Sequence, residues 1–349
     1  RALEQQPEAT QLHAQLGLSY RALGREDEAR AELAKAGDRA PYIEDPLIAF
    51  VEALTEGAEK YIDDARTAAK AGRPDVALRF YDLATSIEPD NTAVLVEMGN
   101  LQGSTGDLDG ALLTIARVLS QQPENAEAAY FVGAILEQKC EQAEADRYYA
   151  RALETRPELV QPRMLLANSL MRQRQFDDAA EHYSQVIRQL PEETEVQYLL
   201  GLAWLAGGQC ELAHQSLLRA LKLSEGDADI LVALARAYST CPDATAEQRQ
   251  QALDAAEARY GASPGLDEAE TLAMACAANG RFEDAVDFQT QAIFEALKEG
   301  DTSRADWHKA NLARYEQQQP AVEPWPLSDP VYYPRPLAPP APAASGAGR

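Results

Sequence analysis

Small apolar residues recur between residues 77 and 220 at a constant step of 34 residues, the distance from Ala77 to Ala111. A second small or branched residue follows each of them seven positions later, and prolines repeat at the same step. Several residue classes that share one period predict a tandem array of equal structural units. The three sets are Ala77, Ala111, Ala145, Ala179 and Ala213; Ala84, Val118, Ala152, Val186 and Ala220; and Pro89, Pro123, Pro157 and Pro191.

The spacing within each period predicts two helices joined by a tight turn. Gly72, Gly106 and Gly208 precede the first alanine of their units by five residues, where the first helix should end and where glycine tolerates a positive φ. The alanines mark a close crossing of the two helices, because a larger side chain would separate them. The prolines end the second helix. No run of alternating Val, Ile and Thr residues favours a β-rich fold.

These positions resemble the tetratricopeptide repeat (TPR) family, over roughly residues 1–299. The resemblance implies an all-α, right-handed α-solenoid of helix-turn-helix TPR units. In the segment 10–43 the matching residues are His13, Leu16-Gly17, Tyr20, Gly24, Ala29, Leu33, Ala36 and Pro41, and in the segment 194–227 they are Leu200-Gly201, Trp204, Gly208, Ala213, Leu217 and Ala220.

The register predicts one TPR unit at 10–43 and seven consecutive units over residues 58–299. Residues 1–9 are interpreted as the end of a truncated upstream repeat. Residues 44–57 are interpreted as a spacer helix, or alternatively as a helix that docks a partner, and residues 300–319 as a C-terminal capping helix. The eight full units are 10–43, 58–91, 92–125, 126–159, 160–193, 194–227, 228–265 and 266–299.

The last thirty residues differ from the array in composition. Residues 320–349 are rich in Pro and small residues, which predicts an extended and mostly disordered Pro-rich tail. Trp325, Tyr332 and Tyr333 are unusual in a solvated linker, so a second hypothesis is that these aromatic side chains dock on the array or on a partner.

Composition limits the classes of partner. The formal net charge of −24 disfavours nucleic-acid binding, because an acidic surface repels phosphate backbones. No stretch of about 18 apolar residues predicts a membrane span. The chain starts at Arg1 without the pattern of a signal peptide, which we interpret as a start that is truncated or processed.

A second resemblance concerns a group of bacterial multi-TPR proteins, many of which look exported. It is carried by Pro7-Glu8-Ala9, Asp45-Pro46-Leu47, Cys241-Pro242-Asp243, the segment 270–282 and the ending Asn311 to Tyr315. The group implies no defined activity. A periplasmic or exported location is therefore an expectation from resemblance, and the sequence does not decide the compartment.

Candidate chemistry is sparse. None of the cysteines Cys140, Cys210, Cys241 and Cys276 forms a CxxC pair, so we expect no metal site. The thiols are either reduced or include one disulfide between neighbouring repeats, for which Cys210 and Cys241 are the best pair. The histidines lie in separate units, and no nucleotide-binding or hydrolase motif occurs. We expect neither a cofactor nor enzymatic activity in this segment.

Function is therefore expected on the concave groove that the first helix of each TPR unit lines. Apolar and aromatic side chains at the fifth position, with polar side chains at the ninth, suit an extended peptide or an amphipathic helix. The alternative is that these side chains only pack against the neighbouring unit. The groove candidates are Ile62, Arg66, Val96, Asn100, Tyr130, Met164, Asn168, Tyr198, Val232 and Arg236.

The interpretation that follows is a protein–protein interaction scaffold or adaptor that holds a partner's peptide or helix in this groove. One alternative is a structural subunit that is fixed within a larger multiprotein assembly. Another is the repeat region of a larger enzyme whose catalytic domain lies upstream. Neither the partner's identity nor the oligomeric state follows from the sequence.

Overall fold

The computed structural model describes residues 10–37, 57–300 and 304–334. Within these ranges the regular structure consists of α-helices and one short 3-10 helix, with no strand. The chain divides into two compact units, and the boundary falls between Met98 and Gly99. The expected truncated repeat at 1–9 and nearly all of the expected spacer helix at 44–57 lie outside the described residues.

The first unit contains two pairs of antiparallel helices and the beginning of α7. In each pair, one helix packs against the next along the chain. The helices are α2 (Gln11–Ala22), α3 (Glu26–Leu33), α5 (Ala58–Lys70), α6 (Pro74–Ile87) and α7 (Thr92–Ser104).

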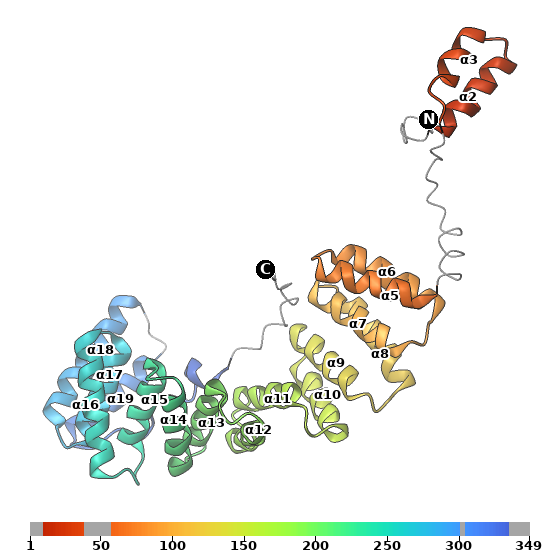
Figure 1. Ribbon diagram of the computed structural model, residues 1–349. Coiled ribbons are helices and arrows are strands. Elements are labelled where there is room, and N and C mark those ends of the chain that lie inside the picture. Colours follow the sequence, from red (N-terminus) through yellow and green to blue (C-terminus); the bar gives the residue numbers. More distant parts are fainter. Residues whose placement is uncertain (1–9, 38–56, 301–303, 335–349) are drawn as a thin grey trace. The chain divides into compact units, whose positions relative to one another are not determined.

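The second unit continues the same alternation through the rest of the chain. Each first helix packs against the second helix of its own pair and of the preceding pair (Figure 1). The helices are α8 (Leu108–Gln121), α9 (Ala126–Gln138), α10 (Gln142–Thr155), α11 (Val160–Arg172), α12 (Phe176–Gln189), α13 (Thr194–Ala206), α14 (Cys210–Leu223), α15 (Ala228–Thr240), α16 (Ala246–Ala262), α17 (Leu266–Ala278), α18 (Phe282–Glu299) and α19 (Ala305–Glu316), followed by the 3-10 helix η1 (Pro330–Tyr332).

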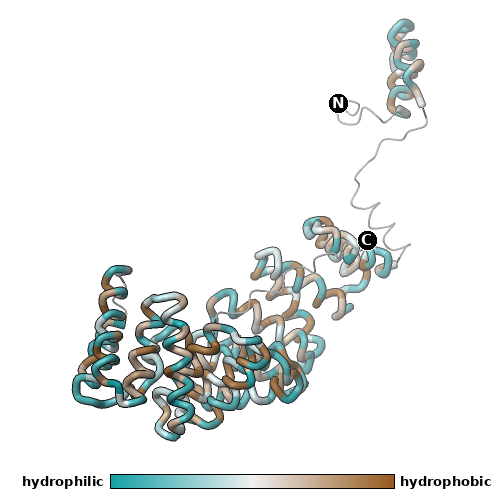
Figure 2. The backbone as a smooth tube through the Cα atoms, turned by 60° about the vertical axis from the view of Figure 1, so that its left-hand side comes forward, coloured by the Kyte–Doolittle hydropathy of each residue, from teal (hydrophilic) through white to brown (hydrophobic). Residues whose placement is uncertain are grey.

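Close approach between the helices of a pair explains the small residues of the sequence. The five alanines that recur every 34 residues from Ala77 to Ala213 are all fully buried. A Cβ added at Gly201 would come within 2.7 Å of the Leu217 side chain, and one at Gly133 within 2.5 Å of the Tyr149 ring. Hydrophobic and hydrophilic residues are interspersed along the helices, as the brown and teal stretches of the tube in Figure 2 show.

The turn inside most pairs uses a left-handed residue, and the longer α15–α16 connection is the exception among the described pairs. Gly72, Gly106 and Gly208 have φ values of 71°, 91° and 76°. Cys140 and Arg174 take the same role in two other pairs, each with a φ of 61°. A side chain with a Cβ is strained in this region, so these two turns are less favourable than the glycine turns.

Replacing Cys140 by glycine should therefore stabilise the array. We expect the free energy of unfolding to rise by about 0.5 to 1 kcal/mol, since the relief of strain exceeds the entropy that glycine adds to the unfolded chain. Urea unfolding followed by circular dichroism measures the change. The Cys140→Ala variant is the control, because it removes the exposed thiol but keeps the strain. An equal gain in both variants would contradict the explanation.

The last helix closes the end of the second unit. α19 packs against α18, and its Tyr315 side chain is almost fully buried. Trp307 is half-buried against the same hydrophobic cluster as Tyr315. In the described part of the chain, no helix combines the length and the apolar character that crossing a bilayer requires.

Candidate functional site

The first helices of the second unit form a continuous surface, which we call the helix-A face and define by α9, α11, α13, α15 and α17. The fifth-position side chains Tyr130, Met164, Tyr198 and Val232 lie along it, and each is half-buried. Met164, Tyr198 and Val232 pack against one shared hydrophobic cluster. Tyr130 instead contacts Phe131 and Tyr149, with ring centroids 5.2 and 6.3 Å apart.

The ninth-position side chains behave differently from one another. Asn168 is buried, and its Oδ1 accepts a hydrogen bond of 2.6 Å from the Tyr183 hydroxyl. Arg236 is fully buried in α15. Asn100 is exposed in α7. The same repeat position therefore serves packing in some units and remains at the surface in another.

The candidates of the first unit are also partly engaged. Arg66 donates hydrogen bonds of 2.6 and 2.9 Å to the Glu97 carboxylate, and these bonds hold the pKa of Glu97 below its ordinary value. Tyr81 donates a further bond of 2.9 Å to the same carboxylate. Ile62 is buried in α5, and Val96 is half-buried in α7.

Residues 320–334, which we call the C-terminal segment, run back from α19 along the helix-A face. η1 within this segment lies beside α13 (Figure 1). Only 6% of Trp325 and 1% of Tyr332 is exposed. The expectation of a disordered tail is thus corrected for residues 320–334, and residues 335–349 lie outside the described residues. The physical reason is that these aromatic side chains bury enough apolar surface to order a segment without regular helix.

Aromatic contacts anchor the C-terminal segment. The Tyr332 ring lies 5.8 Å from the ring of Phe176, the first residue of α12, and 6.1 Å from the Trp325 ring. The Arg236 guanidinium lies over the Trp325 ring at 4.8 Å from its centroid. Trp325 and Tyr332 also belong to the cluster that Met164, Tyr198 and Val232 contact, so the segment covers the central part of the helix-A face.

Four arginines hold the C-terminal segment through polar contacts. Arg236 donates a hydrogen bond of 3.1 Å to the Pro324 carbonyl, and Arg172 donates one of 3.3 Å to the Pro334 carbonyl. Arg174 donates a bond of 3.1 Å to the Tyr333 hydroxyl. Arg304 pairs with the Asp329 carboxylate at 3.3 Å. In addition to the aromatic contacts, the guanidinium groups of Arg236 and Arg172 therefore satisfy two backbone carbonyls of the extended segment.

A buried ionic network lies beneath the C-terminal segment. Arg236 pairs with Glu270 at 2.9 Å, and neither side chain has any exposed surface. The His308 Nδ1 atom lies 2.7 Å from the second oxygen of the same carboxylate. Arg236 also donates to the Thr271 hydroxyl at 2.8 Å. The network therefore links α15, α17 and α19, and it fixes the orientation of the guanidinium that faces Trp325.

A cleft of about 650 Å³ remains between the C-terminal segment and helices α13, α15, α16 and α17. Burial raises the pKa of Asp329 at its wall, against the opposing effects of the Val331 amide and Arg304. The lining includes Tyr198, Asp229, Val232, Asp267, Arg304 and Asp329. The cleft is large enough for a side chain or a short peptide.

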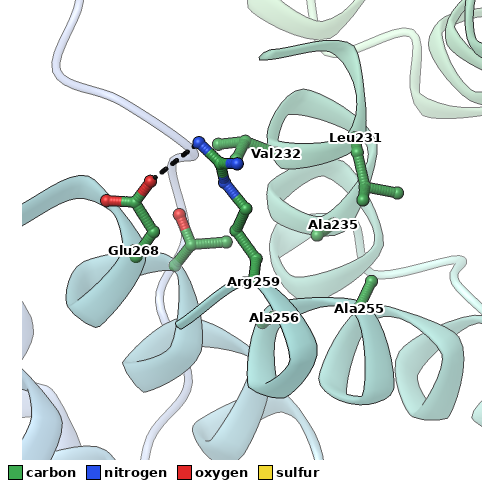
Figure 3. Close-up of a pocket in the computed structure, with 8 residues that line it drawn as sticks. Leu231, Val232, Ala235, Ala255, Ala256, Arg259 and Glu268 are labelled. Carbon is green, nitrogen blue, oxygen red and sulfur yellow. Dashed lines mark ion pairs between the residues drawn. The ribbon is translucent and has the colours of Figure 1, made fainter. Parts of the chain in front are cut away.

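A second cavity nearby is too small for such a ligand. It lies between α15, α16 and α17, where Arg259 pairs with Glu268 at 3.1 Å (Figure 3). Its volume of about 10 Å³ holds at most one water molecule. This cavity is therefore a packing defect beside the ion pair.

The structure contains a disulfide between Cys210, the first residue of α14, and Cys241, which follows α15. This is the disulfide alternative of the sequence analysis, and it links two neighbouring repeats. The Asp243 carboxylate lies within 4.8 Å of both sulfurs, but bonded sulfurs supply no thiolate ligands. Cys140 is a free thiol at the surface, and burial raises the pKa of the free Cys276 thiol to about 11.

Replacing Cys241 by serine should destabilise the repeats around it. Since the disulfide closes a loop of 31 residues, we expect a loss of about 2 to 4 kcal/mol in unfolding free energy. Urea unfolding with and without dithiothreitol measures this loss. Reductant should shift the parent chain toward the variant and leave the variant unchanged. A parent chain that does not respond to complete reduction would contradict the expectation.

Sequence reasoning did not find the arginines that hold the C-terminal segment, apart from Arg236. Arg172 and Arg174 lie at different positions of one repeat and Arg304 lies beyond the last repeat, so no period connects them. Asp329 and Glu270 were also missed. The available signal was the segment itself, in which three aromatic residues accompany two acidic residues and no basic residue.

Three models of tetratricopeptide repeats match the chain, over residues 10–41, 68–135 and 164–228. The chain is a tetratricopeptide repeat protein. The matched ranges lie in both structural units, and the all-α solenoid of helix pairs is the fold that this family implies. A comparison with curated proteins finds no match.

Several solved TPR structures resemble this one. A TPR protein from Parabacteroides merdae is 16% identical, with 74% of this chain and 98% of that chain covered and a TM-score of 0.46. YrrB, "a TPR protein with an unusual peptide-binding site", is 24% identical, with 52% and 95% covered and a TM-score of 0.43. MamA from Desulfovibrio magneticus is 21% identical, with 48% and 95% covered and a TM-score of 0.44.

The TPR repeats support a protein–protein interaction scaffold as the class of function. TPR arrays are typically non-enzymatic and act by presenting a surface that is built from repeated helices. In this chain the repeated first helices form the helix-A face, and the C-terminal segment lies on it.

Proposed function

We propose that the protein is a scaffold or adaptor whose helix-A face binds an extended segment of a partner protein. The observation that carries this proposal is the C-terminal segment, which lies on the face without regular secondary structure apart from η1. A surface that accommodates one extended chain has the pockets and the hydrogen-bond donors that another requires.

The composition of the face supports the same mode of binding. Tyr130, Met164 and Tyr198 combine apolar area with some remaining exposure, which suits a hydrophobic anchor of a partner. Arginine donors beside them can satisfy the backbone carbonyls of an extended chain, as Arg236 does for Pro324. The half-exposed apolar side chains and the arginine donors therefore suit the same ligand, an extended chain with hydrophobic anchors.

Site-specific photocrosslinking tests the proposal in the intact chain. Tyr130 suits the probe p-benzoylphenylalanine because it lies on α9, and none of the contacts of the C-terminal segment described above involves it. Leu113 on α8 is the control position, since it is 73% exposed on a second helix of a pair. We expect discrete adducts in an extract of the source organism from the Tyr130 position and none from Leu113.

The identity of the adduct decides the outcome. Mass spectrometry of the Tyr130 adduct should locate the bond in one extended stretch of a partner, and the purified partner should compete with the crosslink. Adducts that form equally at Leu113, or none at Tyr130, would contradict binding at the helix-A face and would favour a contact elsewhere on the array.

A further inference from the structure

We propose that the C-terminal segment is a displaceable intramolecular ligand, and that the face it covers takes a partner peptide of the same chemistry. That peptide is extended, acidic and Pro-rich, with an aromatic residue, an acidic residue four positions later and a second aromatic residue three positions after that. Trp325, Asp329 and Tyr332 have this spacing. The inference rests on the proposed function and adds the chemistry of the partner and its competition with the chain's own segment.

The three positions are the anchors of the docked segment. Trp325 lies against Arg236, Asp329 pairs with Arg304, and Tyr332 packs on Phe176. All three side chains of the segment are more than nine-tenths buried. Between them, Leu327 and Ser328 are exposed, so their identities contribute little to the docking. Recognition therefore depends on the spacing of three anchors.

Charge complementarity selects the class of peptide. Residues 320–334 contain Glu323 and Asp329 and no Lys or Arg. Four arginines contact the segment, although the chain as a whole has a net charge of −24. At the position of Asp329 an acidic residue of the peptide can pair with Arg304, whereas a basic residue there would face the same guanidinium group.

The segment can leave without stranding buried charges. Arg236 keeps Glu270 as its partner, and Arg304 keeps Asp267 at 3.1 Å. Arg172 keeps Glu137 at 2.8 Å. Release of the segment therefore leaves none of these three arginines without a carboxylate, and the free-energy cost of an unpaired buried ion does not oppose it. The burial of Trp325 and Tyr332 is the main contribution that release removes.

The short connection to α19 determines how a partner competes. Residues 317–319 are exposed and link the segment directly to the end of α19, so the local concentration of the segment at its site is high. A free peptide of equal intrinsic affinity should bind the intact chain at least about 100-fold more weakly than a chain whose own segment is released. A natural partner would overcome this difference through additional contacts.

A fluorescent synthetic peptide of residues 320–334 tests the inference. The receiver is the full-length chain with Trp325→Ala and Tyr332→Ala, which releases the segment and leaves the helix-A face unaltered. Fluorescence anisotropy should show saturable binding to this variant and at least about 100-fold weaker binding to the parent chain. A peptide in which the residues matching Trp325 and Tyr332 are alanine should bind neither chain.

A second receiver covers the case in which the double variant does not fold. A protease site that replaces residues 317–319 allows the folded parent chain to be cut, and the labelled peptide should then exchange into the nicked protein. Failure of the peptide to bind either receiver would overturn the inference and identify the segment as a permanent strap. Equal binding to the parent and the released chain would overturn it as well. Either failure leaves the crosslink at Tyr130 unaffected, so the two proposals are judged separately.

Discussion

Replacing Trp325 by alanine is expected to release the C-terminal segment from the helix-A face. The side chain is almost fully buried against Arg236 and Tyr332, and removing a buried tryptophan costs about 3 to 5 kcal/mol. The effect should be confined to the segment, because the helices beneath it pack on one another. Limited digestion with chymotrypsin, which cuts between Tyr332 and Tyr333 when the segment is released and Tyr332 is no longer buried, measures the change.

Val322 provides a matched control for this prediction. It lies in the same segment but is 62% exposed, so Val322→Ala should leave the rate of cleavage near that of the parent chain. We expect cleavage of the Trp325→Ala variant to be faster by two orders of magnitude or more, about what 3 kcal/mol implies. Equal rates in the two variants would mean that Trp325 does not hold the segment.

Replacing Glu270 by alanine should produce the largest loss of stability in the array itself. The change removes the buried carboxylate partner of the fully buried Arg236 guanidinium and leaves only Asp267 at 3.7 Å, and breaking a buried pair in this way costs about 3 to 5 kcal/mol. It also removes the charge that faces His308. Urea unfolding followed by circular dichroism should show the C-terminal repeats unfolding at a lower denaturant concentration.

Two further variants identify the cause of this loss. Glu268→Ala removes a carboxylate two residues away, whose partner Arg259 is 36% exposed, and should cost at most about 1 kcal/mol. The double variant Arg236→Met with Glu270→Leu removes both buried charges and should recover most of the stability. A double variant as unstable as Glu270→Ala would show that the loss comes from packing volume and not from an unpaired charge.

The helix bounds were largely predictable because the 34-residue period reflects local geometry. From residue 58 onward, each predicted unit starts at the residue where its first helix begins, as at Ala126 and Thr194. Buried alanines and left-handed residues recur because most pairs share the same close crossing and the same kind of turn. A signal that repeats in five consecutive units is insensitive to variation in any one of them.

The surface chemistry was less predictable because equal repeat positions meet different neighbours. Arg66 and Arg236 occupy the same position in their units, yet the first is exposed and paired with Glu97 while the second has no exposed surface. That difference arises from Glu270 and Trp325, which lie 34 and 89 positions further along the chain. Periodicity places a side chain on a face, but contacts between distant segments determine whether it is buried.

The C-terminal segment shows the same limit. Its composition correctly indicated the absence of regular helix over most of residues 320–334, because proline cannot continue one. Whether such a segment docks depends on complementary groups elsewhere, and Arg172, Arg174 and Arg304 supply them from three separate helices or turns. The composition of the segment alone therefore cannot predict whether it docks.

Hydrogen–deuterium exchange of the intact chain is the most direct test that the helix-A face holds an extended polypeptide. The amides of Asp329, Val331, Tyr332 and Tyr333 donate hydrogen bonds within the docked segment. They should exchange at least about 100-fold more slowly than in the free peptide, and Trp325→Ala should abolish the protection. Exchange at the free-peptide rate in the parent chain would show that the face is open, and it would contradict the occupancy on which the proposed peptide-binding function rests.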